Sequence, residues 1–206
     1  MAGVPRWPAI VAVLVVGTLL SLASSQLHLG PWWLPLVVVV ILLVPLEIAS
    51  RRNLHGKRRG LAMVLLGAMT VAVAVSSAFL IQQLLFGDLE PTSLLSGAGA
   101  IWVANLLVFS TWYWEIDGGG PAMRRRDGHV STDFLFPQMQ VGDGTTHGWW
   151  PSFIDYLFVA FNASSAFSPT DTLILSHRAK ILMMVQSLIA IVTVVVIAAR
   201  AINTLR

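Results

Sequence analysis

Long apolar runs constrain this chain more than any other feature of its sequence. A helix needs about 20 apolar residues to cross the ~30 Å hydrocarbon core of a bilayer. Charged residues make up 11% of the 206 residues, less than half of the ~25% that is typical of soluble chains. Five runs are long and almost free of charge: residues 8–27, 34–50, 61–86, 94–114 and 179–203. We therefore expect an all-α polytopic membrane protein, a transmembrane helix bundle with five firm spans.

A sixth apolar stretch, residues 153–175, is too short to be assigned in the same way. Its apolar part ends at Phe167, and Pro169 follows closely. Irregular backbone persists at membrane depth only where protein or water shields it. We expect either a half-helix with an irregular polar end or a sixth span. The two alternatives leave the C-terminus on opposite sides of the membrane.

The thirteen Lys and Arg residues predict the orientation of the chain. They cluster at residues 51–59, between the second and third spans, and at residues 124–126, after the fourth span. Cytoplasmic loops of membrane proteins are enriched in Lys and Arg. We therefore expect an integral protein of the cell (inner) membrane with a cytoplasmic N-terminus. The expected parts are a four-span N-terminal helix bundle (1–115), a cytoplasmic loop (116–151) and a C-terminal unit of half-helix, polar loop and final span (152–206).

The loop after the fourth span is long for an idle connection. It opens with Gly-Gly-Gly-Pro at 118–121, which is typical of a helix end. The apolar residues 134–136 can dock on another part of the chain. We expect this loop to form a partly ordered cap on the bundle.

Three polar residues stand out near or within the apolar runs: Glu47, Asn105 and Asp155. Glu47 lies four residues before Arg51, which indicates a local ion pair, with a proton relay as the alternative. Asn105 follows small residues at 96, 100 and 104, a spacing that lets helix backbones approach, so we expect it to bond to a neighbouring helix. The aromatic residues 112–114 are typical of an anchor at the membrane interface.

Residues 155–172 read Asp-Tyr-Leu-Phe-Val-Ala-Phe-Asn-Ala-Ser-Ser-Ala-Phe-Ser-Pro-Thr-Asp-Thr, and Arg178 and Lys180 precede the final apolar run. In order and spacing this region resembles the pore module of two-helix potassium channels. Most of the chain also resembles a family of small bacterial inner-membrane proteins. That family shares the basic loop after the second span, the aromatic end of the fourth span and this C-terminal segment. It implies a membrane location and no particular activity.

The channel resemblance implies a pore-like loop at the functional centre of the protein. Potassium filters need glycines that point successive carbonyls at the ion. Serine, proline and threonine stand at those positions here, so we expect poor discrimination between sodium and potassium. Such channels also enter their pore from outside, whereas the charge pattern would make this segment enter from the cytoplasm. The residues of the predicted loop are Asn162, Ser164, Ser165, Ser168, Pro169, Thr170, Asp171 and Thr172.

The leading functional hypothesis is a weakly selective cation pore formed by a homo-oligomer in the lipid bilayer, with a monovalent cation as the permeating species. Two alternatives stay open, a non-conducting membrane assembly or stability subunit and a small-solute carrier. The chain has no cysteine and no histidine pair at metal-ligand spacing. We therefore expect no enzyme activity, no metal site and no cofactor. Because the cations mark cytoplasmic loops, we expect no nucleic-acid binding.

Overall fold

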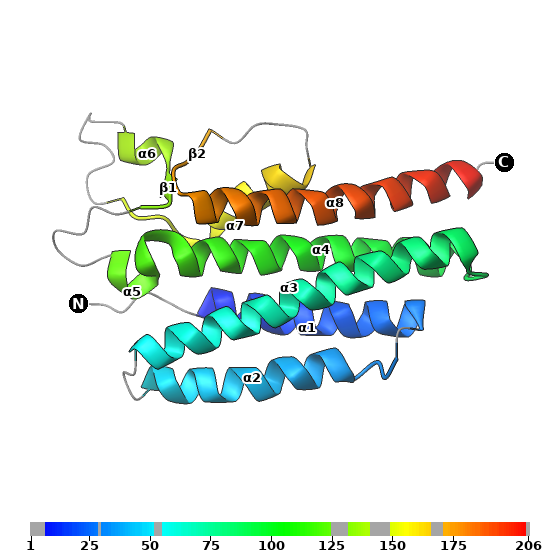
Figure 1. Ribbon diagram of the computed structural model, residues 1–206, viewed down its shortest axis with the longest axis horizontal. Helices are drawn as coiled ribbons and strands as arrows, with labels where there is room; N and C mark the ends of the chain where they lie inside the picture. The colour runs from blue at the N-terminus through cyan, green and yellow to red at the C-terminus, as the bar shows by residue number, and fades with distance from the viewer. Residues whose placement is uncertain are drawn as a thin grey trace.

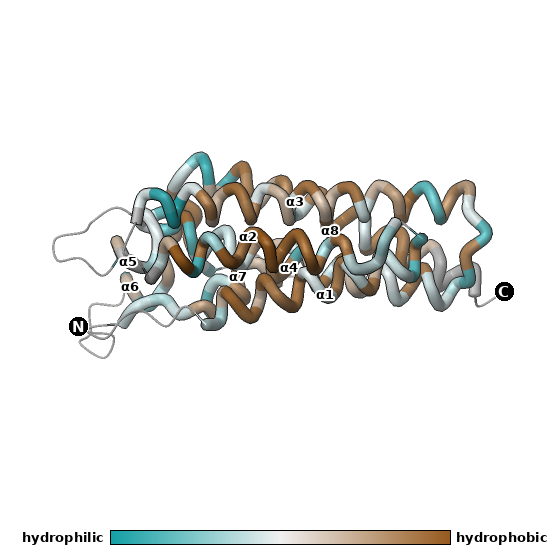
Figure 2. Tube along the Cα trace, turned by 90° about the horizontal axis from the view of Figure 1, so that it is seen from below, coloured by the Kyte–Doolittle hydropathy of each residue, from teal (hydrophilic) through white to brown (hydrophobic). Residues whose placement is uncertain are grey.

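Five long helices lie side by side and form an elongated bundle (Figure 1). The computed structural model describes residues 7–28, 30–51, 55–124, 132–140, 149–165 and 171–204. Hydrophobic residues dominate the middle of the helices, and hydrophilic residues gather toward their ends (Figure 2). The all-α prediction is confirmed. The five helices are α1 (Trp7–Leu27), α2 (Leu34–Arg51), α3 (His55–Phe86), α4 (Pro91–Ile116) and α8 (His177–Thr204).

Four of the described helices, α1, α3, α4 and α8, are long and apolar enough to cross a membrane. Helix α2 is shorter, with an apolar part of Leu34–Ser50, and it contains Pro45. A helix of that length rises only about 26 Å, which is less than the hydrocarbon thickness. The expected count of five spans is therefore supported for four helices.

Helix α4 lies at the centre of the bundle and packs against α1, α3, α7 and α8. Helix α1 comes closest at Gly97, where an added Cβ would lie 3.1 Å from the Leu27 side chain. Ala104 is buried as the small-residue spacing predicted, whereas Ser96 is exposed. The close approach near the start of α4 is therefore made by Gly97, one position after the predicted serine.

Helix α7 (Phe153–Ser165) is a half-helix of 13 residues. The chain then returns through β2 (Leu173–Ile174), which pairs antiparallel with β1 (Phe134–Leu135) from the loop after α4. This two-stranded sheet lies at the end of the bundle where α7 and α8 both begin (Figure 1). The half-helix alternative therefore agrees with the structure, and a sixth full span does not. As a result, α1 begins and α8 ends at opposite ends of the molecule.

Part of the long loop forms an ordered cap, as expected. Gly118, Gly119 and Gly120 turn the chain after α4 with φ values of 54°, 81° and 99°, a region that favours glycine. Phe134 and Phe136 of the cap are buried, which confirms that this apolar segment docks on another part of the chain. Residues 125–131 and 141–148 of this loop lie outside the described residues. The cap contains the 3-10 helix η1 (Asp117–Gly119), α5 (Pro121–Arg124), β1 and α6 (Pro137–Gln140).

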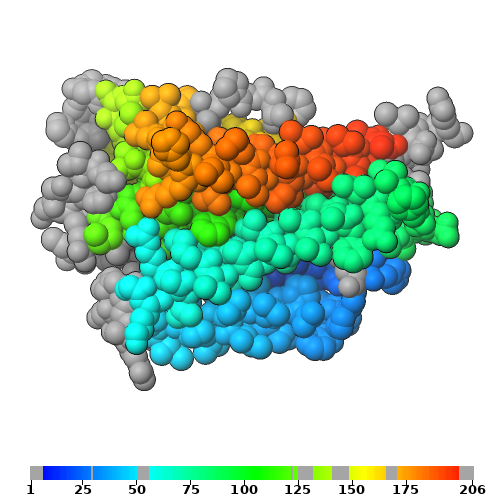
Figure 3. Space-filling model, in the orientation of Figure 1, coloured from blue at the N-terminus to red at the C-terminus, as the bar shows by residue number. Residues whose placement is uncertain are grey.

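Helix α8 is the least covered of the four candidate spans. Only 22% of its most apolar window is buried, against 50% for α1 and for α4. Figure 3 shows α8 along one open face of the molecule, beside α3. Apolar side chains are exposed along its length, namely Ile181, Met184, Val185, Leu188, Ile191, Val194 and Val195. This surface is suited to lipid tails or to another apolar helix.

Candidate functional site

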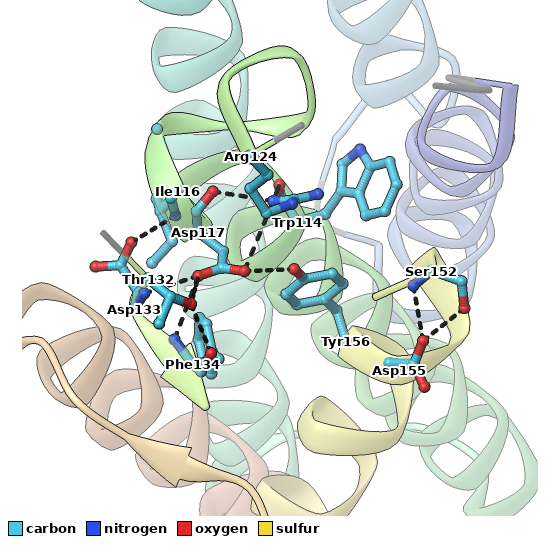
Figure 4. Close-up of polar contacts among 12 residues, drawn as sticks. Trp114, Ile116, Asp117, Arg124, Thr132, Asp133, Phe134, Ser152, Asp155 and Tyr156 are labelled. Atoms are coloured by element: carbon cyan, nitrogen blue, oxygen red, sulfur yellow. Dashed lines mark hydrogen bonds and ion pairs between the residues drawn. The ribbon is translucent and has the colours of Figure 1, made fainter. Parts of the chain in front are cut away.

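A buried carboxylate at the end of α4 accepts hydrogen bonds from two other parts of the chain. The Asp117 Oδ1 atom accepts from the Thr132 hydroxyl at 2.9 Å. The same atom accepts from the backbone N–H groups of Asp133 at 2.7 Å and Phe134 at 3.2 Å. Its Oδ2 atom accepts from the Tyr156 hydroxyl of α7 at 2.6 Å. Figure 4 shows Asp117 in the middle of these donors, which together we call the Asp117 cluster.

Both oxygens of Asp117 are therefore engaged. Hydrogen bonds to a charged acceptor are stronger than those between neutral groups. The cluster thus fixes the start of α7 and the strand β1 to the end of α4. A carboxylate held in this way serves the structure, because using it as an acid or base would break several of these bonds.

Arg124 of α5 brings a compensating positive charge to the Asp117 cluster. Its NH1 atom donates to the carbonyls of Trp114 at 2.7 Å and Asp117 at 3.0 Å. It lies 3.9 Å from the Asp117 carboxylate, and the guanidinium faces the Trp114 ring at 4.7 Å from its centroid. A buried charge needs such a partner. Trp114 is buried and Trp112 donates to the Thr70 hydroxyl at 2.9 Å, so the expected interfacial anchors point into the protein.

A bidentate ion pair joins the start of α8 to the cap. Arg178 donates to Asp133 through Nε at 2.7 Å and through NH2 at 2.6 Å, and NH2 also donates to the Ile116 carbonyl at 3.2 Å. The Gly118 N–H donates to the same carboxylate at 3.1 Å. Burial alone would raise the pKa of Asp133, but hydrogen bonds from Arg178 and Ser176 and the Arg178 charge hold that pKa below the ordinary aspartate value. The pair joins α4, β1 and α8.

A second polar cluster lies inside the bundle and uses only neutral groups. The Gln186 side-chain carbonyl of α8 accepts from the Tyr113 hydroxyl of α4. Its Nε2 atom donates to the Ala160 carbonyl and to the Ser164 hydroxyl of α7, both at 2.7 Å. Asn105 donates to the Gln186 backbone carbonyl at 3.3 Å. This Gln186 cluster holds α4, α7 and α8 together through neutral groups, which cost less to bury than charges.

Glu115 lies two residues before Asp117 and turns toward α3 instead. Arg58 NH2 donates to Glu115 Oε1 at 2.6 Å, and the two side chains are 11% and 6% exposed. Within the described residues, Glu115 Oε2 and Arg58 Nε are buried and have no hydrogen-bond partner. Two cavities of about 220 Å³ and 40 Å³ adjoin this ion pair. Glu115 is therefore a carboxylate with one unpaired oxygen, in a residue that lines both cavities.

Five of the predicted pore-like residues lie in the described part of the chain, and their surroundings differ. Ser164 is buried in the Gln186 cluster, and the Ser165 hydroxyl donates to the Asn162 carbonyl of its own helix at 3.4 Å. Thr172 is buried, whereas Asp171 is exposed where the chain returns to β2. The remaining members lie outside the described residues: Ser168, Pro169 and Thr170.

The three polar residues predicted near or within the runs take different roles. Glu47 lines the smaller of the two cavities, and the side chain of its expected partner Arg51 lies outside the described part of the chain. Asn105 bonds across to α8, as its position on α4 indicated. Asp155 accepts from the backbone N–H and the hydroxyl of Ser152, both at 2.7 Å. The Asp155 carboxylate thus holds Ser152 at the start of α7 (Figure 4).

Sequence reasoning missed the three residues that organise these contacts, namely Glu115, Asp117 and Gln186. The available signals were two carboxylates directly after an apolar run and a single amide inside the last run. Within the described residues, no group of three or more His, Asp and Glu side chains could hold a metal ion. The chain matches no family model, and no curated protein or solved structure is significantly similar to it.

Proposed function

We propose that this chain is a membrane permeation protein in which α7 is a re-entrant half-helix beside a weakly selective path for monovalent cations. The observation that carries the proposal is the return of the chain to its starting end after the 13 residues of α7. A helix that stops partway leaves polar backbone at membrane depth, where it needs protein or water around it. In membrane proteins such interrupted helices occur where they line a cavity or path.

The charge distribution of α7 favours cations over anions. The C-terminal end of a helix carries a partial negative charge of about half an elementary charge. In α7 this end carries the hydroxyl groups of Ser164, which is buried, and Ser165, which is partly buried. The exposed Asp171 adds a full negative charge near the return of the chain. Hydroxyl oxygens can replace part of an ion's hydration shell but do not form a rigid ladder of carbonyls.

A path of this kind requires more than one copy of the chain. Helix α7 presents Ile154, Phe158 and Phe161 outward, and the open face of α8 lies next to it. We propose that these apolar faces meet between copies in a homo-oligomer of the cell membrane. With the N-terminus in the cytoplasm, as the cationic loops predict, α7 enters from the cytoplasmic side. This direction is opposite to that of potassium channels.

A second function, a non-conducting assembly or stability subunit, is favoured by one specific contact. The Ser164 hydroxyl accepts a bond from Gln186 of the same chain at 2.7 Å. A side chain that is engaged in this way is not directed at a permeating ion. In this alternative the apolar faces of α7 and α8 bind another membrane protein, and nothing passes.

Purified protein in liposomes with an imposed cation gradient distinguishes the two functions. We expect sodium and potassium fluxes of similar size and little anion flux. Asp171→Asn should lower the preference for cations over anions, whereas Asp88→Asn, in the exposed turn at the opposite end of the bundle, should not. Flux equal to that of empty vesicles at every voltage would favour the assembly subunit. Strong selectivity for potassium would contradict the proposed path.

A further inference from the structure

A buried carboxylate oxygen without a partner belongs to a side chain that lines a cavity at the end of the bundle where α3 begins and α4 ends. The Glu115 side chain is 6% exposed, and Arg58 binds its Oε1 atom at 2.6 Å. Within the part of the chain that the structure describes, Oε2 has no hydrogen-bond donor. Burying a charged oxygen without a donor costs free energy. A bound group that supplies N–H donors would recover that free energy.

The larger cavity, of about 220 Å³, gives such a group room. Glu115, Arg59 and the turn glycines line it. A Cβ added to Gly120 would lie in van der Waals contact with Glu115 Oε2 at 3.9 Å, so this glycine of the cavity wall borders the unpaired oxygen. On the same cavity Arg59 NH1 donates to the Gly119 carbonyl at 3.1 Å, which uses one of the five donors of a guanidinium. The cavity thus combines an unfilled acceptor with a cationic group.

The smaller cavity continues this space toward the apolar interior. It measures about 40 Å³, and Arg58 and Glu115 line both it and the larger cavity. Most of its other lining residues are apolar and come from α1, α2 and α3. Leu65 lines this cavity and also a third one of about 190 Å³, whose lining is entirely apolar. The polar site therefore adjoins apolar space between the helices.

We propose that this site binds the headgroup of a membrane phospholipid that carries a primary ammonium group beside its phosphate. The ammonium donates to Glu115 Oε2 after the carboxyl group turns toward the cavity, and the phosphate lies against Arg59. A zwitterionic headgroup supplies both charges, so it complements a cavity with one unfilled acceptor and one guanidinium. Soluble phosphoethanolamine has the same chemistry, but the adjoining apolar cavities favour a lipid. This inference is independent of the proposed cation path, which uses the opposite side of α4.

A methylation series of lipids tests the ammonium contact on the unchanged protein. Purified protein in detergent is titrated with phosphatidylethanolamine, its monomethyl and dimethyl forms, and phosphatidylcholine, and bound lipid is counted by native mass spectrometry. Each methyl group removes one N–H donor. We expect an affinity about tenfold lower for phosphatidylcholine than for phosphatidylethanolamine, because hydrogen bonds to charged groups are lost. Equal affinities across the series would overturn the proposal.

Matched variants locate the contact. Glu115→Gln should abolish the preference for phosphatidylethanolamine. Glu90→Gln, an exposed change at the opposite end of α4, should leave the preference intact. Arg59→Gln should weaken binding of both lipids to a similar degree, because both carry the phosphate. A preference that survives Glu115→Gln would refute the site. If that variant does not fold, the methylation series decides alone.

Soluble phosphoethanolamine forms the third arm of the experiment. We expect it to compete with phosphatidylethanolamine at least tenfold more weakly than a second phospholipid with the same headgroup, because it leaves the apolar cavities empty. Competition at equal strength would overturn the assignment to a lipid.

Discussion

Two carboxylates at the end of α4 lie two residues apart and have opposite surroundings. Asp117 is fully buried and accepts hydrogen bonds on both of its oxygens from the cap and from α7. Glu115 is 4% exposed, and only one of its oxygens has a donor within the described residues. The two residues are therefore almost equally buried, but Asp117 has hydrogen-bond donors on both oxygens and Glu115 on only one. A carboxylate with donors on both oxygens holds segments together, whereas one with an unpaired oxygen can accept a hydrogen bond from a ligand.

The difference follows from which segments each side chain faces. Asp117 faces β1, α7 and α5, where the aromatic rings of Phe134, Phe136 and Tyr156 pack edge to face or tilted at 5.4 to 6.5 Å between centroids. Glu115 faces the start of α3, where the packing leaves cavities. The α4–α7–α8 side of the molecule is thus joined by polar clusters, and the α1–α3 side contains the open space.

Removing the Asp117 carboxylate should have the largest effect on stability. Asp117→Ala removes the carboxylate acceptor of the Thr132 and Tyr156 hydroxyls and of two backbone N–H groups, and it removes the negative charge that faces Arg124, which we expect to cost about 3–5 kcal/mol. The measurement is the free energy of unfolding in a mixed-micelle denaturant titration. Asp88→Ala, at an exposed position, serves as the control and should change stability by less than about 0.5 kcal/mol. Equal losses in the two variants would mean that Asp117 does not hold the cap.

Disrupting the Gln186 cluster should have a smaller effect, although its members are just as deeply buried. Tyr113→Phe removes the hydroxyl that donates to Gln186, and hydrogen bonds between helices in membranes average about 0.6 kcal/mol and reach about 1.7 kcal/mol. We expect a loss within that range in the same titration. A loss larger than that of Asp117→Ala would reverse the ranking of the two clusters.

Acidification should remove the contribution of Asp133. Its folded pKa lies below the ordinary aspartate value, so the stabilisation is complete above a pH of about 4 and is lost as pH falls through the lower folded pKa. Arg178 is half exposed, and solvent screening limits the effect to about 1 kcal/mol. The difference in thermal stability between the unchanged protein and Asp133→Asn should therefore shrink toward zero below pH 4. A difference that stays constant from pH 7 to pH 3 would contradict this role.

The fold was largely predictable because it depends on local patterns. Apolar runs predicted the long helices, Gly-Gly-Gly-Pro predicted the end of α4, and the shortness of the 153–167 run indicated a half-helix. The order of the elements in space was not predictable. Asp117 meets Tyr156 from 39 positions away, and Asp133 meets Arg178 from 45 positions away, so no local pattern connects them.

The candidate site was predicted less well, for a physical reason. Polar residues near the half-helix were assigned to a pore because the order and spacing of the segment resemble a channel pore module, yet the Ser164 hydroxyl accepts a bond from Gln186 and Asp155 caps its own helix. Whether a polar side chain serves the protein or a ligand depends on the donors around it. Those donors come from distant segments, and their arrangement exists only in the folded chain.

The most direct test of the contrast between the two carboxylates is a pair of isosteric changes measured in the same unfolding titration. Asp117→Asn presents an amide N–H₂ to groups that are themselves donors, so we expect a loss of about 2–4 kcal/mol. Glu115→Gln keeps an oxygen for Arg58 and puts its N–H₂ group where Oε2 has no partner, but it removes the counter-charge of Arg58, so in lipid-free detergent we expect a smaller loss of about 1–2 kcal/mol. Losses of equal size, or a larger loss for Glu115→Gln, would contradict the assignment of Asp117 to the fold and of Glu115 to ligand binding.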